Sequence, residues 1–215
     1  MKKIKKILLG TILAATCAFS ACGAVAPQAE GETAATVTTQ INSFESQYDL
    51  NYMSMQNVLG IITLEKDTQY IKSGETSMKI WVQPNPFNDI TLFDTRIPYL
   101  MHSLELKRIN EDHTNFKNVT KVKVDVYNAQ DTVEKFGLNI CLKAQSRAFV
   151  CTKTTYYDVQ PGWNTVEMEI TKTTIPSVYK RKAIGVSFVF ERPKSTDEGK
   201  TFYIDDFRLE SVAEE

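Results

Sequence analysis

The sequence predicts an all-β fold, a β-sandwich or jelly roll, for residues 42–212. Three stretches alternate apolar and polar side chains with a period of two, which is typical of strands buried on one face. Turn-forming clusters separate the predicted strands, and no long stretch keeps the 3.6-residue period of an amphipathic helix. Many short antiparallel strands without intervening helices favour packed sheets. The alternating stretches are 121–127, 165–170 and 184–190, and the turn clusters are 72–75, 128–131 and 160–162.

The first 21 residues have the three zones of a secretion signal. Four lysines within the first six residues precede an apolar run, 7–19, and small residues follow it. The run is shorter than the roughly 20 residues that span a bilayer, and a polar stretch comes after it. A retained transmembrane helix is therefore disfavoured.

The end of this signal resembles a bacterial lipobox. A large apolar residue, Phe19, stands three places before Cys22, and the small residues Ser20 and Ala21 fill the gap. The resemblance implies a lipid on Cys22, which would anchor an extracytoplasmic, surface-exposed protein to the cell membrane. Phe19 differs from the commoner leucine, so ordinary cleavage near Ala21 and free secretion remain the alternative.

A flexible linker is expected over residues 22–41, because this segment holds almost no large apolar side chain. A flexible coil of that length has a root-mean-square reach of about 25 Å, enough to lift a domain off a lipid surface. The domain at 42–212 follows without a second linker or an internal repeat.

The charge of the mature chain argues against a nucleic-acid partner. The whole sequence has 25 basic and 26 acidic side chains. Removal of residues 1–21 takes four lysines and no acids, which leaves 21 basic against 26 acidic side chains, a net charge of −5. The remaining basic runs are too short to neutralise a phosphate backbone.

Two of the four cysteines remain for the domain, since Cys17 leaves with the signal and Cys22 carries the lipid. Cys141 and Cys151 flank a predicted hairpin, and pairing about Ser146 would place them opposite each other. Opposed residues at a non-hydrogen-bonded site come close enough for a disulfide, and an exported location permits one. A pair of free thiols is the alternative.

Further strands are expected at 77–83, 137–143, 148–157 and 201–210.

Five motifs in order resemble the jelly-roll carbohydrate-binding modules of the galactose-binding-like superfamily. The resemblance implies the fold and does not specify a sugar. The motifs are Phe44-Glu45, the turn and strand 73–80, the strand 118–128, the Gly162-Trp163 strand entry within 161–166, and the closing strand 202–207.

The same resemblance implies a structural calcium ion. Glu45 matches the carboxylate of the family's first strand, Asp205 the aspartate of its closing strand, and the turn from Ser73 to Ser77 the carbonyl donors. Ca²⁺ prefers six to eight oxygen ligands of these kinds. The alternative is that Glu45 and Asp205 are ordinary surface acids.

Strand parity nominates a sugar-binding face, which needs flat aromatic rings and planar polar groups. If Met78, Ile80 and Val82 face the core, alternation along the strand turns Trp81 outward. The same alternation turns Tyr127 outward. It also turns Tyr157 outward if Val150 faces inward. A covering loop over Trp81 is the alternative, and Trp163 is assigned to packing. The predicted platform is Trp81, Tyr127 and Tyr157, with Asp125, Gln83, Asn139 and Glu167 as hydrogen-bonding neighbours.

No catalytic constellation stands out. His102 and His113 have no metal-ligand spacing, so solvated surface positions are expected. Glu167 and Glu169 share one face, but nothing marks either as a general acid. We therefore expect a non-catalytic, monomeric, cell-surface glycan-binding lipoprotein. A structural or protein-interaction domain is the main alternative, and a polysaccharide-active enzyme comes third.

Overall fold

The computed structural model describes residues 35–55, 60–84, 99–143, 149–171, 182–194 and 197–213. The predicted signal peptide, Cys22 and most of the predicted linker lie outside these residues. Within the described ranges, no helix has the length and apolar character needed to cross a membrane.

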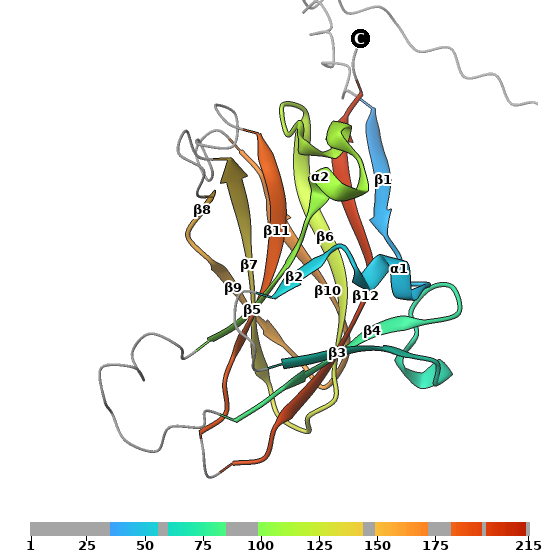
Figure 1. Cartoon of the computed structure of the whole chain (residues 1–215), viewed down its shortest axis with the longest axis vertical. Helices are drawn as coiled ribbons and strands as arrows, with labels where there is room; N and C mark the ends of the chain where they lie inside the picture. Colours follow the sequence, from blue (N-terminus) through green and yellow to red (C-terminus); the bar gives the residue numbers. More distant parts are fainter. Residues whose placement is uncertain are drawn as a thin grey trace, which may run out of the picture. The chain divides into compact units, whose positions relative to one another are not determined.

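Two antiparallel sheets make up the domain, which confirms the predicted β-sandwich (Figure 1). The first sheet has the order β10-β6-β12-β4-β3, and β1 also pairs with β12. Its strands are β1 (Thr36–Asn42), β3 (Gly60–Glu65), β4 (Ser77–Val82), β6 (Val119–Asn128), β10 (Gly162–Glu169) and β12 (Lys200–Val212).

The second sheet has the order β2-β5-β11-β7-β8, and β9 also pairs with β7. Short helical turns connect strands: α1 (Gln47–Leu50), η1 (Thr68–Tyr70), α2 (Leu106–Ile109) and η3 (Glu111–Thr114). The strands of the second sheet are β2 (Met53–Met55), β5 (Tyr99–Leu104), β7 (Glu134–Lys143), β8 (Phe149–Cys151), β9 (Thr155–Val159) and β11 (Ala183–Glu191).

The core lies between the inner faces of the two sheets. Side chains that alternate along the strands are fully buried, as in Val122, Val124 and Val126 of β6. Aromatic side chains of the two sheets contact each other. The ring centroids of Phe190 in β11 and Phe202 in β12 are 4.9 Å apart. The period of two seen in the sequence is thus the burial of one face of each strand.

Strand β1 begins inside the segment that the sequence assigned to the linker. Residues 36–40 are exposed, and only Ile41 and Asn42 at its end are buried. The strand is held by backbone pairing to β12 rather than by apolar side chains. A strand of this kind leaves no hydrophobic pattern in the sequence. For that reason the sequence predicts a flexible linker there.

Candidate functional site

Trp81 lies on β4, on the face of the first sheet turned away from the core. Its side chain is 36% exposed. The backbone of Gly199 lies against the indole, since a Cβ atom at Gly199 would stand 2.4 Å from Nε1. Gln83, the predicted polar neighbour, is half-buried just past the end of β4. Trp81 is therefore a fixed ring that is partly open to solvent.

Tyr127 belongs to a packed aromatic cluster instead of an open platform. The rings of Tyr70 and Tyr203 stack with centroids 4.1 Å apart. Tyr127 meets Tyr70 edge-on at 5.1 Å and Trp163 at 5.4 Å. Its hydroxyl also accepts a hydrogen bond from Gln69 Nε2 at 3.2 Å. These rings cover one another, so Tyr127 offers a sugar little flat surface.

Asp125 is buried and holds strands together. Its carboxylate accepts a 2.5 Å hydrogen bond from Thr165 Oγ1 of β10 and pairs with Arg208 of β12 at 2.8 Å. This predicted sugar-binding carboxylate therefore connects strands of the first sheet.

The predicted outward orientation of Tyr157 is wrong. Residues 152–154 separate β8 from β9 and interrupt the alternation that was counted from Val150. Tyr157 pairs with the buried Phe136 and packs against the core, while its neighbour Tyr156 faces outward. A slip of one residue moves a side chain to the opposite face of a strand.

Tyr156 lies exposed on the outer face of the second sheet. Its side chain is 41% exposed, and a Cβ atom on its partner Gly137 would lie 2.9 Å from the ring. Because Gly137 has no side chain, the tyrosine ring can lie directly on the sheet. Lys135 and Asp158 form an exposed ion pair next to it, and Thr154 lies on its other side. We call these residues the Tyr156 surface.

Buried polar groups lie beside Tyr156 on the same face of the sheet. Asn139 Nδ2 donates a 3.1 Å hydrogen bond to Thr154 Oγ1, so this predicted sugar-binding amide positions Thr154. The hydroxyls of Ser103 and Ser187 lie 2.7 Å apart on the same face. Among the described residues, this face thus combines the Tyr156 ring with hydroxyl and amide groups that hydrogen bonds hold in place.

Cys141 and Cys151 stand directly opposite each other on β7 and β8, which confirms the predicted register. Both are thiols here, with their sulfur atoms 2.6 Å apart. The contact with Cys151 lowers the pKa of the Cys141 thiol to about 7 and raises the pKa of the Cys151 thiol. Their oxidation to a disulfide stays a prediction.

The turn at residues 72–76 closes over Glu45. Glu45 Oε2 accepts hydrogen bonds from the backbone N–H groups of Glu75 at 2.9 Å and Thr76 at 3.1 Å. Gly74 has a φ of +73°, and a Cβ atom there would lie 1.6 Å from Glu45 Oε1. Only glycine meets both the backbone and the space requirement at this position.

Asp205 holds the other side of the same turn. Its Oδ2 accepts hydrogen bonds from the N–H groups of Lys72 at 2.8 Å and Ser73 at 2.9 Å. Asp205 is fully buried, and burial raises its pKa to about 6. Ser77 is also fully buried, and its Oγ has no hydrogen-bond partner.

The sequence was right that Glu45, Asp205 and the 73–77 turn meet. The turn meets the two carboxylates through the backbone N–H groups of Lys72, Ser73, Glu75 and Thr76, so carbonyl oxygens of the turn would have to face an ion for Ca²⁺ to bind there. Among the described residues, no three His, Cys, Asp or Glu side chains gather as a metal site. Hydroxyl, backbone and water oxygens would have to complete the two carboxylates.

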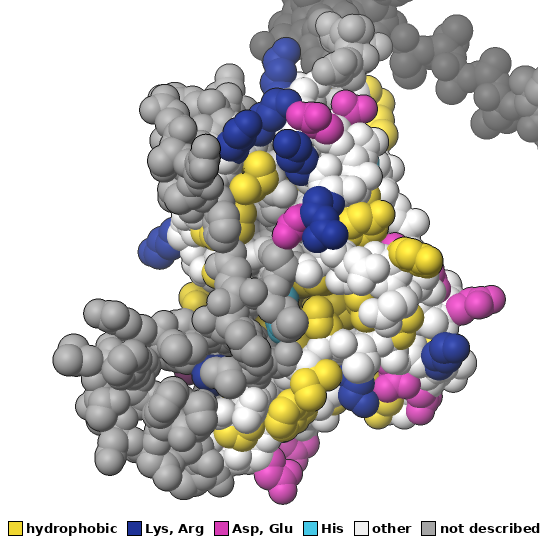
Figure 2. Space-filling view, in the orientation of Figure 1, with side chains coloured by type: hydrophobic (Ala, Val, Ile, Leu, Met, Phe, Trp, Pro, Cys, Tyr) yellow, Lys and Arg dark blue, Asp and Glu magenta, His cyan; other side chains and the backbone are white. Residues whose placement is uncertain are grey.

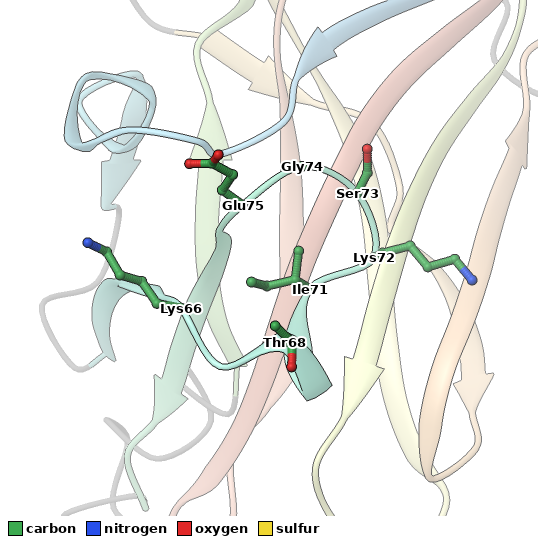
Figure 3. Close-up of a pocket in the computed structure, with 7 residues that line it drawn as sticks. All are labelled: Lys66, Thr68, Ile71, Lys72, Ser73, Gly74 and Glu75. Carbon is green, nitrogen blue, oxygen red and sulfur yellow. The ribbon is translucent and has the colours of Figure 1, made fainter.

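A hollow of about 420 Å³ lies inside the loop that leads to this turn, lined by residues within 66–75. Figure 3 shows Ile71 pointing into the loop and Lys72 pointing away from it. Lys72 reaches toward Trp163, with its Nζ 6.0 Å from the ring centroid. The loop therefore joins the carboxylate pair to the aromatic cluster.

The predicted solvated surface position is wrong for His102. It is fully buried on β5, and both ring nitrogens lack hydrogen-bond partners. The sequence held a signal for this, because His102 alternates with Leu100 and Leu104, and a strand turns such residues to one face.

The fold is similar to solved carbohydrate-binding modules. A family 11 module from Clostridium thermocellum, in complex with a β-1,3-1,4-mixed-linked tetrasaccharide, has a TM-score of 0.52 at 10% identity, covering 83% of this chain and 98% of that one. The CBM22-1 xylan-binding domain from Paenibacillus barcinonensis has a TM-score of 0.51 at 8% identity, covering 85% and 97%. The chain has the jelly-roll fold of carbohydrate-binding modules.

A third similar structure is a two-module fragment of a Clostridium thermocellum endo-1,4-β-D-xylanase, complexed with xylohexaose. The TM-score is 0.54 at 12% identity, with 82% of this chain covered. The match spans only 29% of that longer chain. No family model and no curated protein matches the sequence.

Proposed function

We propose that this protein is a non-catalytic glycan-binding module displayed on the cell surface through a lipid on Cys22. The observation that carries the proposal is the Tyr156 surface, an exposed ring lying on a sheet of this fold. The solved neighbours are named for xylan, xylohexaose and a mixed-linked tetrasaccharide, which supports a polysaccharide ligand.

The chemistry of the Tyr156 surface suits a sugar ring. A flat aromatic face buries the apolar face of a pyranose, and the ring has an orientation fixed by Gly137. The Lys135 and Asp158 pair and the Thr154 hydroxyl can exchange hydrogen bonds with sugar hydroxyls. Preformed groups lose little conformational freedom on binding.

The charges argue against Glu167 as a catalytic acid and disfavour a nucleic-acid partner. Glu167 is held by Lys121 at 3.0 Å and Lys123 at 2.8 Å, and these bonds lower its pKa. An ionised carboxylate of this kind cannot act as the general acid of a glycosidase. Figure 2 shows acidic side chains among the basic ones on the described part of that face.

We also propose that Glu45 and Asp205 bind a structural calcium ion together with oxygens of the 73–77 turn. The calcium would offset the two carboxylate charges and fix the turn against β12. The ion would stabilise the fold and would take no part in sugar contact.

Matched alanine variants of the two exposed rings test the sugar-binding face. Tyr156→Ala should weaken binding to xylan or mixed-linkage β-glucan by about tenfold or more, because stacking on one aromatic ring is lost. Trp81→Ala removes a ring of similar exposure on the other sheet and should leave the affinity within about twofold. Isothermal titration calorimetry measures both. A loss of affinity in Trp81→Ala but not in Tyr156→Ala would instead place the sugar-binding site at Trp81.

A further inference from the structure

A second hollow, which we call the edge pocket, lies where the two sheets meet at one side of the sandwich. Its volume is about 540 Å³, within the range of about 300–1,000 Å³ typical of ligand pockets. Residues 152–155 and Tyr157 of the second sheet line one wall, and residues 167–169 at the end of β10 line the other. All of these residues belong to the described part of the chain.

One wall supplies an aromatic ring and hydroxyl groups. Tyr157 is half-buried and packs against the core, so its ring is held in place. Burial and the charge of Glu169 raise the pKa of its phenol, which therefore stays a hydrogen-bond donor at neutral pH. Thr155, which is exposed, lies along the same wall.

The other wall supplies carboxylates that are held in place by ion pairs. Lys121 binds Glu167 at 3.0 Å and Glu169 at 3.3 Å, and Lys123 binds Glu167 at 2.8 Å. The carboxylates are thus ion-paired with two lysines, and Lys153 lines the opposite wall. The pocket therefore offers charged hydrogen-bonding groups of both signs, which suits a molecule rich in hydroxyl groups.

We propose that the edge pocket is a second sugar-binding site that takes one or two units of a glycan. The inference rests on the proposed function and extends it to another part of the molecule. Neighbouring residues of β9 point to opposite sides, so Tyr156 serves the outer face and Tyr157 serves the edge pocket. A glycan-covered surface would then meet two separate contacts on one domain.

The test is a titration of the ¹⁵N-labelled domain with xylobiose and cellobiose, followed by amide chemical shifts. Two groups of amides should shift, one around Gly137 and Tyr156 and one around Thr155, Tyr157 and Met168. Glu169→Ala should weaken the second group by about tenfold, because a charged hydrogen bond to the sugar is lost, and should leave the first unchanged.

Glu111→Ala on η3 is the control, since its side chain is 64% exposed against 57% for Glu169. It should behave like the wild type. Shifts confined to the Tyr156 group, or equal affinities in Glu169→Ala and Glu111→Ala, would overturn the edge-pocket proposal alone. No shifts with any neutral sugar would overturn the proposed function as well.

Discussion

His102 is a polar residue in the core that the fold keeps uncharged. Its side chain is fully buried against the second sheet, and neither ring nitrogen has a hydrogen-bond partner. Burial lowers its pKa from 6.5 to about 4, because a charged imidazolium would lose its hydration there. The cost of charging this one side chain couples the stability of the domain to pH.

The predicted pH effect follows from the sign of this shift. Below about pH 6.5 the unfolded chain binds a proton at His102 before the folded chain does, so stability falls as the pH drops from 6.5 toward 4. Above pH 6.5 the contribution is constant. A shift of this size corresponds to a loss of about 3 kcal/mol across that window.

Urea unfolding of the wild type and His102→Leu at pH 7.5 and pH 4.5 measures this contribution. The wild type should lose more unfolding free energy than the variant between the two pH values. Parallel losses in the two proteins would show that His102 does not titrate with unfolding.

Individual side chains were the hardest part to predict from the sequence. Tyr157 was assigned outward because alternation was extended across residues 152–154, where the strand is interrupted. Glycine at 137 was a usable signal for a ring on the sheet surface, but only once the register with Tyr156 was known. The burial of His102 becomes predictable only when residues 99–104 are recognised as a strand, because His102 then shares a face with Leu104.

Strands were better predicted, because one buried face leaves a period of two in the sequence. The alternating segments became β6, β10 and β11, and the glycine turn at 72–75 precedes β4 as expected. Strand β1 was not predicted, because its residues 36–40 are exposed and show no apolar alternation. Pairing between strands far apart in the chain, such as β1 with β12, was not predictable from composition.

The turn at 72–76 is the element whose stability should depend on calcium. Excess chelator should lower the melting temperature of the wild type, and added Ca²⁺ should restore it. At a calcium concentration one hundred times Kd the stabilisation would be about 2.7 kcal/mol. Differential scanning calorimetry measures the shift.

Glu45→Gln is the matched variant for this experiment, because the amide oxygen can still accept hydrogen bonds from the turn while the charge is lost. Its melting temperature should respond little to chelator or calcium. A wild-type melting temperature that does not change in excess chelator would remove the calcium site.

At the scale of the whole molecule, the two sheets present different surfaces. The outer face of the first sheet is occupied by the packed aromatic cluster and by the turn held between Glu45 and Asp205. The outer face of the second sheet carries the Tyr156 surface, and the edge pocket lies between the sheets at one side. A lipid on Cys22 would hold these contacts at the cell surface, where even modest affinities add up over many anchored copies.

The central claim is that this domain binds a polysaccharide, and affinity gel electrophoresis tests it most directly. The wild-type domain should migrate more slowly in native gels containing xylan or mixed-linkage β-glucan than in gels without polysaccharide, and Tyr156→Ala should migrate faster than the wild type in the same gels. Unchanged migration of the wild type across a panel of plant, host and bacterial polysaccharides would contradict the account.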